Sequence, residues 1–350
     1  MASTGPVWSR KSGKTMIKLT EIKRQLLICI FVTFVFAILP FFLTQRYLLG
    51  EVIVFFFWAM VAMNWNLLMG HAGVFSLAQM LFFAIGAYGV AMAITFLGFS
   101  IWVAIPLAVL TSAIVALIIG LACLRLTGAY VALLTYAIAE MVHVLIITDT
   151  ECFTLIRNNC QQLFGGYAGF SRFDDFGFRP LLKRNWILGN YYVVLFAFSL
   201  TIIIIIMIIH GRLGLAFRAI RDNVGYASSR GIDRKRYQVA AFACSAFLTG
   251  LAGAMYAGHF RFAGPSLFDF STLMFVLSMV VVGGIGSTWG PLIGAGVMMT
   301  VVELSKGMGD ARNLLLGIAL VIFVVVLPKG LAGLAASVVR RVRERATPKT

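Results

Sequence analysis

Long apolar segments, separated by short polar stretches, dominate the chain. A helix rises about 1.5 Å per residue, so roughly 20 apolar residues cross a hydrocarbon layer about 30 Å thick. This rule predicts ten membrane-spanning helices, over 26–44, 51–69, 74–97, 101–123, 129–148, 189–209, 237–258, 271–287, 290–306 and 313–328. Glycine-rich sequence around 70–75 and 283–290 indicates that one or both junctions are breaks within the membrane rather than loops.

The composition agrees with this pattern. The chain has 350 residues, of which 61% are hydrophobic and 12% charged, and its mean hydropathy is +0.95. A soluble domain carries about a quarter charged residues, so a cytosolic enzyme is excluded. A transmembrane β-barrel would alternate apolar and polar residues, whereas Ile202 to Ile206 is a continuous run of isoleucine. The predicted fold is an all-α, polytopic membrane protein.

The charges predict the orientation. The chain has 29 Lys and Arg against 13 Asp and Glu, a net charge of +16. Most of the bases fall on one side of the predicted helices, which by the positive-inside rule places both termini in the cytoplasm. The bases flank apolar segments, where lipid headgroups account for them, so we expect no nucleic-acid partner.

The segments divide the chain into a basic cytoplasmic N-terminus (1–25), a membrane domain (26–330) and a basic cytoplasmic tail (331–350). The first apolar stretch is long enough to span and is not followed by a small-residue cleavage site, so we interpret it as an uncleaved helix rather than a signal peptide. Two polar segments exceed simple turns, an external loop over 149–188 and an internal loop over 210–236. Cys152 and Cys160 lie in the external loop, where an oxidising compartment would let them pair, but their spacing leaves pairing open.

No motif in the chain predicts an energy source or a catalytic centre. Gly13-Lys14-Thr15 imitates the end of a phosphate-binding loop, but the first glycine of that motif would fall at Trp8. The His and Cys residues have no metal-ligand spacing, and no serine lies in a Gly-x-Ser-x-Gly turn. We therefore expect no cofactor, metal or catalytic residue in this chain. Uphill transport would draw on an ion gradient or on another subunit.

Polar residues at membrane depth are costly and mark candidate functional positions. Glu140 lies in the fifth predicted span with His143 one turn later, and Glu303 lies near the outer end of the ninth. Either carboxylate could line a path or act as a gate, or could form a structural hydrogen-bonded pair. The candidate translocation path comprises Asn64, Asn66, Gly70, Gly73, Ser76, Gln79, Thr135 and Glu140.

The two loops offer candidate docking sites. In the external loop, Gly165, Gly166 and Tyr167 are candidates for contact with an external partner. In the internal loop, Phe217, Ile220 and Val224 share one face at helical spacing and predict a single short amphipathic helix. This helix could lie among lipid headgroups or dock into a groove on a soluble partner.

Seven motifs in register resemble the permease subunits of branched-chain amino acid ABC importers of the LivM type, over roughly 55–335. They are Asn66-Leu67-Leu68-Met69-Gly70-His71-Ala72-Gly73, Leu124-Arg125-Leu126-Thr127-Gly128-Ala129-Tyr130, Gly165-Gly166-Tyr167-Ala168-Gly169, Arg218-Ala219-Ile220-Arg221-Asp222-Asn223 with Gly231-Ile232, Gly250-Leu251-Ala252-Gly253-Ala254-Met255-Tyr256, Val282-Gly283-Gly284-Ile285-Gly286-Ser287-Thr288-Trp289-Gly290-Pro291 and Leu327-Pro328-Lys329-Gly330-Leu331.

The resemblance implies an importer of several subunits in the bacterial inner membrane. This chain would pair with a second permease as a heterodimer, a periplasmic binding protein would deliver the solute, and two cytoplasmic ATP-binding subunits would carry ATP and Mg. The resemblance assigns an ATPase-coupling role to Arg218, Ile220, Arg221, Asp222, Ala227 and Gly231. Val224 stands where relatives commonly carry an acid, so the contacts with the ATPase can differ in detail.

The solute remains open at this stage. The family implies a branched-chain or other hydrophobic amino acid, with urea, short amides, aromatic acids and simple sugars as alternatives. An ion-coupled secondary carrier and a membrane scaffold without transport activity are the alternatives from other classes.

Overall fold

The computed structural model describes residues 7–43, 45–156, 159–179 and 185–306, with scattered positions between 317 and 337. Its long helices are α1 (Val7–Phe42), α2 (Arg46–Asn66), α3 (Gln79–Leu97), α4 (Ile101–Ala122), α5 (Ala129–Ile147), α7 (Trp186–His210) and α10 (Arg234–Phe260). Within the described residues, seven helical segments are long and apolar enough to cross a membrane. The predicted class, a polytopic helical membrane protein, is confirmed.

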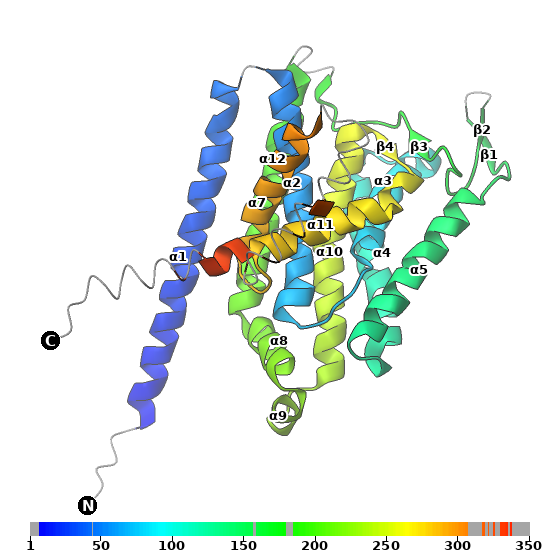
Figure 1. Ribbon diagram of the computed structural model, residues 1–350. Helices are drawn as coiled ribbons and strands as arrows, with labels where there is room; N and C mark the ends of the chain where they lie inside the picture. The colour runs from blue at the N-terminus through cyan, green and yellow to red at the C-terminus, as the bar shows by residue number, and fades with distance from the viewer. Residues whose placement is uncertain are drawn as a thin grey trace, which may run out of the picture.

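The two ends of the helix bundle differ, as Figure 1 shows. One end carries α8 (Arg212–Asp222), α9 (Val224–Ser229) and the start of α1, and we call it the basic end. The opposite end carries β1 (Thr154–Ile156) and β2 (Asn159–Gln161), and we call it the hairpin end. The internal and external loops predicted from the charges therefore do lie at opposite ends.

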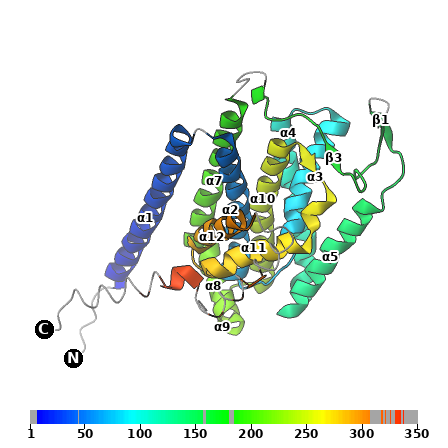
Figure 2. The ribbon, with the colours of Figure 1, turned by 45° about the horizontal axis from the view of Figure 1, so that its top comes forward.

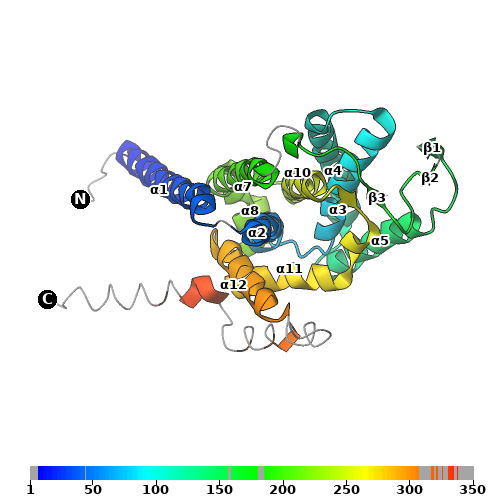
Figure 3. The same cartoon turned by 90° about the horizontal axis from the view of Figure 1, so that it is seen from above.

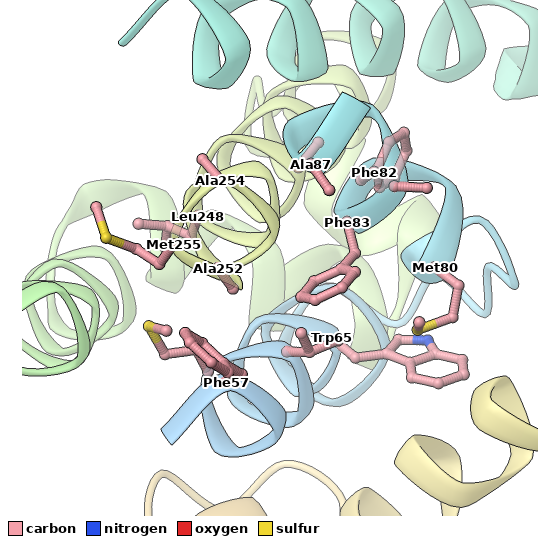
Figure 4. Close-up of a cluster of buried hydrophobic side chains, with 14 of the residues drawn as sticks. Phe57, Trp65, Met80, Phe82, Phe83, Ala87, Leu248, Ala252, Ala254 and Met255 are labelled. Atoms are coloured by element: carbon pink, nitrogen blue, oxygen red, sulfur yellow. The ribbon is translucent and has the colours of Figure 1, made fainter. Parts of the chain in front are cut away.

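The centre of the bundle is formed by α2, α3, α4 and α10. Figure 4 shows Phe83 of α3 between α2 and α10, with Trp65 of α2 beside Met80. Small residues allow this close approach: a Cβ on Gly86 would lie 2.1 Å from the carbonyl oxygen of Gly250. Such contacts are typical of membrane helices, because lipid provides no hydrophobic force that drives helices together.

Helices α1 and α5 lie at the edges of the bundle (Figures 2 and 3). Only 6% of the most apolar stretch of α1 is buried, against 72% for the segment that contains α2. Hydroxyl groups of α7 attach α1, because Tyr191 donates a hydrogen bond to the carbonyl of Phe36 at 2.6 Å. Helix α1 begins at Val7, so the predicted N-terminal segment 1–25 is helical from that residue on.

The helices α11 (Phe270–Gly283) and α12 (Gly290–Leu304) form a bent pair. At about 1.5 Å per residue each is about 20 Å long, shorter than the hydrocarbon layer. Lys306, just beyond α12, binds Glu51 near the start of α2 at 2.7 Å, so α12 ends where α2 begins. The glycine-rich break predicted at 283–290 is present. The expected full spans over 271–287 and 290–306 are shorter helices, and most of the tenth predicted span, 313–328, lies outside the described residues.

Short strands at the hairpin end depart from an entirely helical fold. β1 and β2 pair in antiparallel register, and a disulfide joins Cys152 to Cys160 across them. β3 (Phe170–Ser171) pairs with β4 (Phe262–Ala263), the segment that follows α10. This second pairing ties the loop between α5 and α7 to the end of α10. The predicted basic tail, 331–350, is mostly outside the described residues.

Candidate functional site

Helix α2 ends irregularly, and this leaves backbone hydrogen-bonding groups without their usual helical partners. Helix α2 continues into a π-helical turn, η1 (Leu67–His71), and the chain then runs without regular structure as far as α3. π-Turns inside helices often occur at functional sites. The break predicted at 70–75 is therefore present. It also moves the start of the third helix from the expected residue 74 to Gln79.

Asn66 connects this break to the turn between α11 and α12. Its Oδ1 accepts a hydrogen bond from the amide of Gly286 at 2.7 Å, and its Nδ2 donates one to the carbonyl of Ser287 at 2.8 Å. Asn66 is almost fully buried. The backbones also touch, because a Cβ on Gly70 would lie 2.5 Å from the nitrogen of Gly286. These hydrogen bonds and this close approach thus hold together two chain breaks that are far apart in sequence.

Arg221 of α8 binds the same place from the basic end. Its Nη1 donates a hydrogen bond to the carbonyl of Gly70 at 2.6 Å, and Asp222 accepts from its Nε at 3.1 Å and from its Nη2 at 3.0 Å. The side chain of Arg221 also covers Gly73, where an added Cβ would lie 2.6 Å from its Cγ. We call Asn66, Gly70, Arg221, Gly286 and Ser287 the junction.

The other coupling candidates shape the internal loop. Arg218 donates to the carbonyl of Gly214 in its own helix at 3.2 Å and to the carbonyl of Ile209 at 3.0 Å, and so satisfies a carbonyl in the last turn of α7. Ile220 lines a cavity of about 180 Å³ beside Arg221. Ala227 is buried, and its carbonyl accepts from Ile232 at 3.1 Å.

The short amphipathic helix expected over Phe217 to Val224 is present as α8, but it ends at Asp222, so the prediction that Val224 continues the same helix is wrong. Asn223 adopts an extended conformation (φ −160°, ψ 111°) and separates α8 from α9. Its side chain accepts a hydrogen bond from the amide of Tyr226 at 2.9 Å, so it caps α9. Phe217 is consequently buried, whereas Val224 is exposed. Gly231, with φ +78°, lies in the turn before α10.

A second group of polar residues lies in the helix core. Gln79 of α3 donates hydrogen bonds to Ser245 and Thr249 of α10, and Ser245 donates to the carbonyl of Asn64 at 2.8 Å. We call Asn64, Gln79, Ser245 and Thr249 the core cluster. All four are fully buried. Among the described residues, the side chain of Asn64 has no hydrogen-bond partner, and neither does the ring of His71.

Two further path candidates hold the irregular segment before α3. The carbonyl of Ser76 accepts a hydrogen bond from the indole of Trp65 at 2.9 Å. Thr135 of α5 accepts one from the amide of Leu77 at 3.0 Å. Ser76 and Thr135 are both buried. They therefore contribute to the packing around the break, next to the junction and the core cluster.

Glu140 does not join these groups. It lies on α5, with a side chain 36% exposed, and binds His143 one turn away at 3.3 Å. The ring of His143 stacks on Phe268 with the centroids 5.4 Å apart. Glu303 is at the hairpin end of α12, where it binds Lys306 at 2.6 Å with its side chain 41% exposed.

The external-loop candidates form a tight turn at the hairpin end. Gly165 and Gly166 both have positive φ angles, of 79° and 56°. Asp149 accepts a hydrogen bond from the amide of Phe164 at 2.6 Å and fixes the start of this turn. Tyr167 follows with 86% of its surface exposed. The turn presents an aromatic side chain to the outside of the bundle.

Sequence comparison identifies the family of the chain. The family model described as a branched-chain amino acid transport system permease component matches residues 47–327. The chain belongs to this permease family. It is 31% identical over 281 residues to the high-affinity branched-chain amino acid transport system permease protein LivM of Salmonella typhimurium, and 30% identical over the same length to that of Escherichia coli. Each alignment covers 76% of this chain and 65% of the relative, so the match spans about two thirds of their length. No solved structure matches significantly.

Several residues of this permease contribute to the site although sequence reasoning did not select them. Ser245 and Thr249 are four residues apart on α10, a spacing that places both on one helix face. Gly286 and Ser287 lie in a glycine-rich motif that indicates a chain break, yet the sequence did not show which segment the break would contact. Pairing of Cys152 with Cys160, left open by their spacing, is present.

Proposed function

We propose that the chain is a permease subunit of an ATP-driven importer in the bacterial inner membrane, with both termini in the cytoplasm. It forms a pathway with a second permease, and a periplasmic binding protein delivers the solute. Two ATP-binding subunits on the cytoplasmic side carry ATP and Mg and drive the cycle. The family membership supports this proposal, and the solute class that it favours is a branched-chain or other hydrophobic amino acid.

One observation carries the proposal: an exposed helical unit at the basic end is bonded directly to a break in the bundle. Helices α8 and α9 expose Leu215, Val224 and Tyr226, apolar side chains that suit a groove on a soluble subunit. Behind them, Arg221 binds the carbonyl of Gly70. An ATPase that moves α8 would therefore act on the bundle through a short, charge-assisted hydrogen bond.

The hairpin end suits the opposite compartment. A disulfide such as Cys152–Cys160 persists where conditions are oxidising, as in the periplasm. The exposed Tyr167 beside the glycine turn is a suitable contact for a binding protein, because tyrosine is enriched in protein interfaces. With this side outward, α8 and α9 face the cytoplasm.

Reconstitution tests the proposal. The chain is co-expressed with its candidate second permease and ATPase, purified, and placed in liposomes with the binding protein outside and ATP inside. We expect uptake of radiolabelled leucine only with ATP and the complete complex. Competition with isoleucine, urea, an aromatic acid and ribose then tests the solute class. Uptake by this chain alone, collapsing with the ion gradient, would instead indicate a secondary carrier.

Docking is tested in the same complex. Gly231→Val strains the turn before α10, where φ is +78°, and Tyr226→Asp puts a charge on the exposed face of α9. We expect both variants to recover less ATPase on co-purification, by tenfold or more. Tyr167→Asp, at the opposite end, is the matched control and should recover the normal amount. Normal recovery with both changes near α9 would contradict the docking assignment.

A further inference from the structure

The junction joins three segments that are separate in sequence and that end in broken or short helices. Arg221 belongs to α8, Gly70 to the π-turn after α2, and Gly286 to the turn between α11 and α12. Gly70 contacts both of the others: its carbonyl binds Arg221, and its α-carbon lies against the backbone of Gly286. No side chain fits between η1 and the turn, so a displacement of one must displace the other.

The α11–α12 pair is suited to move. Both helices are about 20 Å long, and among the described residues the pair packs on the bundle mainly along α2, with Lys306 binding Glu51 at the hairpin end. The exposed side chain of Ile285 lies in the turn at the far end of the pair. A pair that packs mainly on α2, and whose turn lies against Gly70 and is hydrogen-bonded to Asn66, can tilt about α2 without breaking the contacts among α3, α4 and α10.

We propose that α8 and the 284–289 turn move as one body, so that the α11–α12 pair is the part of the membrane domain that the ATPase displaces. Arg221 and Asn66 are then positioning residues: Arg221 transmits the displacement to Gly70, and Asn66 transmits it onward to the turn. This inference rests on the proposed function, and it adds which helices carry the motion.

The π-turn can accommodate this movement by changing its own conformation. A π-turn holds one more residue than an α-helical turn, so it can rewind when its contacts change. His71 ends the turn and is buried with no hydrogen-bond partner among the described residues. An unsatisfied buried ring raises the free energy of this arrangement, which favours a second arrangement in which the ring is satisfied.

Distances between spin labels test the inference in the intact complex. Labels are placed on Arg212 of α8, Ile285 of the turn and Leu121 of α4, all exposed, in a background without Cys29, Cys123 and Cys244. ATP is trapped with a hydrolysis-deficient ATPase. We expect the 212–285 distance to stay constant and the 121–285 distance to shift beyond the width of its distribution. A constant 121–285 distance, or a 212–285 distance that changes as much, would overturn the inference.

A coupling measurement supplies a second readout. We expect Arg221→Met to keep ATP hydrolysis within about twofold while the solute taken up per ATP falls at least tenfold, and Arg221→Lys, which can still donate to Gly70, to recover most of it. Arg212→Met, an exposed arginine in the first turn of α8, is the matched control and should match the wild type. Unchanged uptake per ATP in Arg221→Met would overturn the inference.

Uptake by the wild-type complex tests the proposed function separately. If that complex shows no ATP-dependent uptake, the proposed function fails. If uptake is normal and the turn is static, only the inference about the α11–α12 pair fails.

Discussion

The junction and helix α5 both place polar side chains at membrane depth, and they differ in what those side chains hold. Asn66 is buried and binds the backbone of a turn 220 residues away in sequence. Glu140 is half-exposed and binds His143 on its own helix. The uncharged amide therefore joins two segments that are far apart in sequence, while the carboxylate binds within one turn of its own helix.

This difference follows from the cost of charge in a low-dielectric environment. A buried carboxylate needs a partner of opposite charge and further hydrogen bonds, whereas an amide needs only a donor and an acceptor. A helix break offers both as free backbone groups. Of these two side chains, the one that makes long-range contacts is the uncharged one beside a helix break. The comparison yields three predictions.

The largest effect is expected for Gly70→Ala. The new Cβ would lie 2.2 Å from Oδ1 of Asn66 and 2.5 Å from the nitrogen of Gly286, and neither can yield without separating the two breaks. We expect overpacking to cost about 1–3 kcal/mol of stability and uptake to fall at least tenfold. Thermal stability in detergent and uptake in cells measure this.

Gly50→Ala is the matched control for that change. It lies on α2, and a Cβ there would meet nothing within 4 Å. Alanine favours helix, so stability should be unchanged or slightly higher. Equal losses in the two variants would show that the close approach at Gly70 is unimportant.

An intermediate effect on thermal stability is expected when Asn64 or Asn66 of α2 is replaced. The sign of the change should differ between the two variants. Asn66→Val leaves the amide of Gly286 and the carbonyl of Ser287 without this partner, which should cost about 1 kcal/mol in total because both groups are only part-buried. Asn64→Val removes a buried amide with no partner among the described residues and should raise the melting temperature. Thermal unfolding of both variants measures this, and losses of the same size would contradict the contrast drawn here.

The smallest effect is expected on α5. Glu140→Gln keeps a hydrogen-bonding group beside His143, so uptake should stay within about twofold of the wild type. Glu140→Leu removes it and should reduce uptake further, in folded protein. Equal, large losses with both substitutions would indicate that the negative charge itself is required, and would return Glu140 to the path.

The sequence predicts the helices well, because each must present about 20 apolar residues to lipid. It also predicts both breaks, since glycine clusters at 70–75 and 283–290 interrupt apolar segments. It does not predict that the two breaks meet, because that contact is made by backbone atoms and by one asparagine. The break at Asn223 was missed for a related reason: the apolar spacing of Phe217, Ile220 and Val224 is helical, and a side-chain cap interrupts it.

The edge position of α1 bears on how this architecture can vary. The family match begins at residue 47, after α1, and little of α1 is buried. Trp289, in the 284–289 turn, donates a hydrogen bond to Gln25 of α1. Of the long apolar helices that the structure describes, α1 has the smallest buried share, so its removal should disturb the packing of the other helices least.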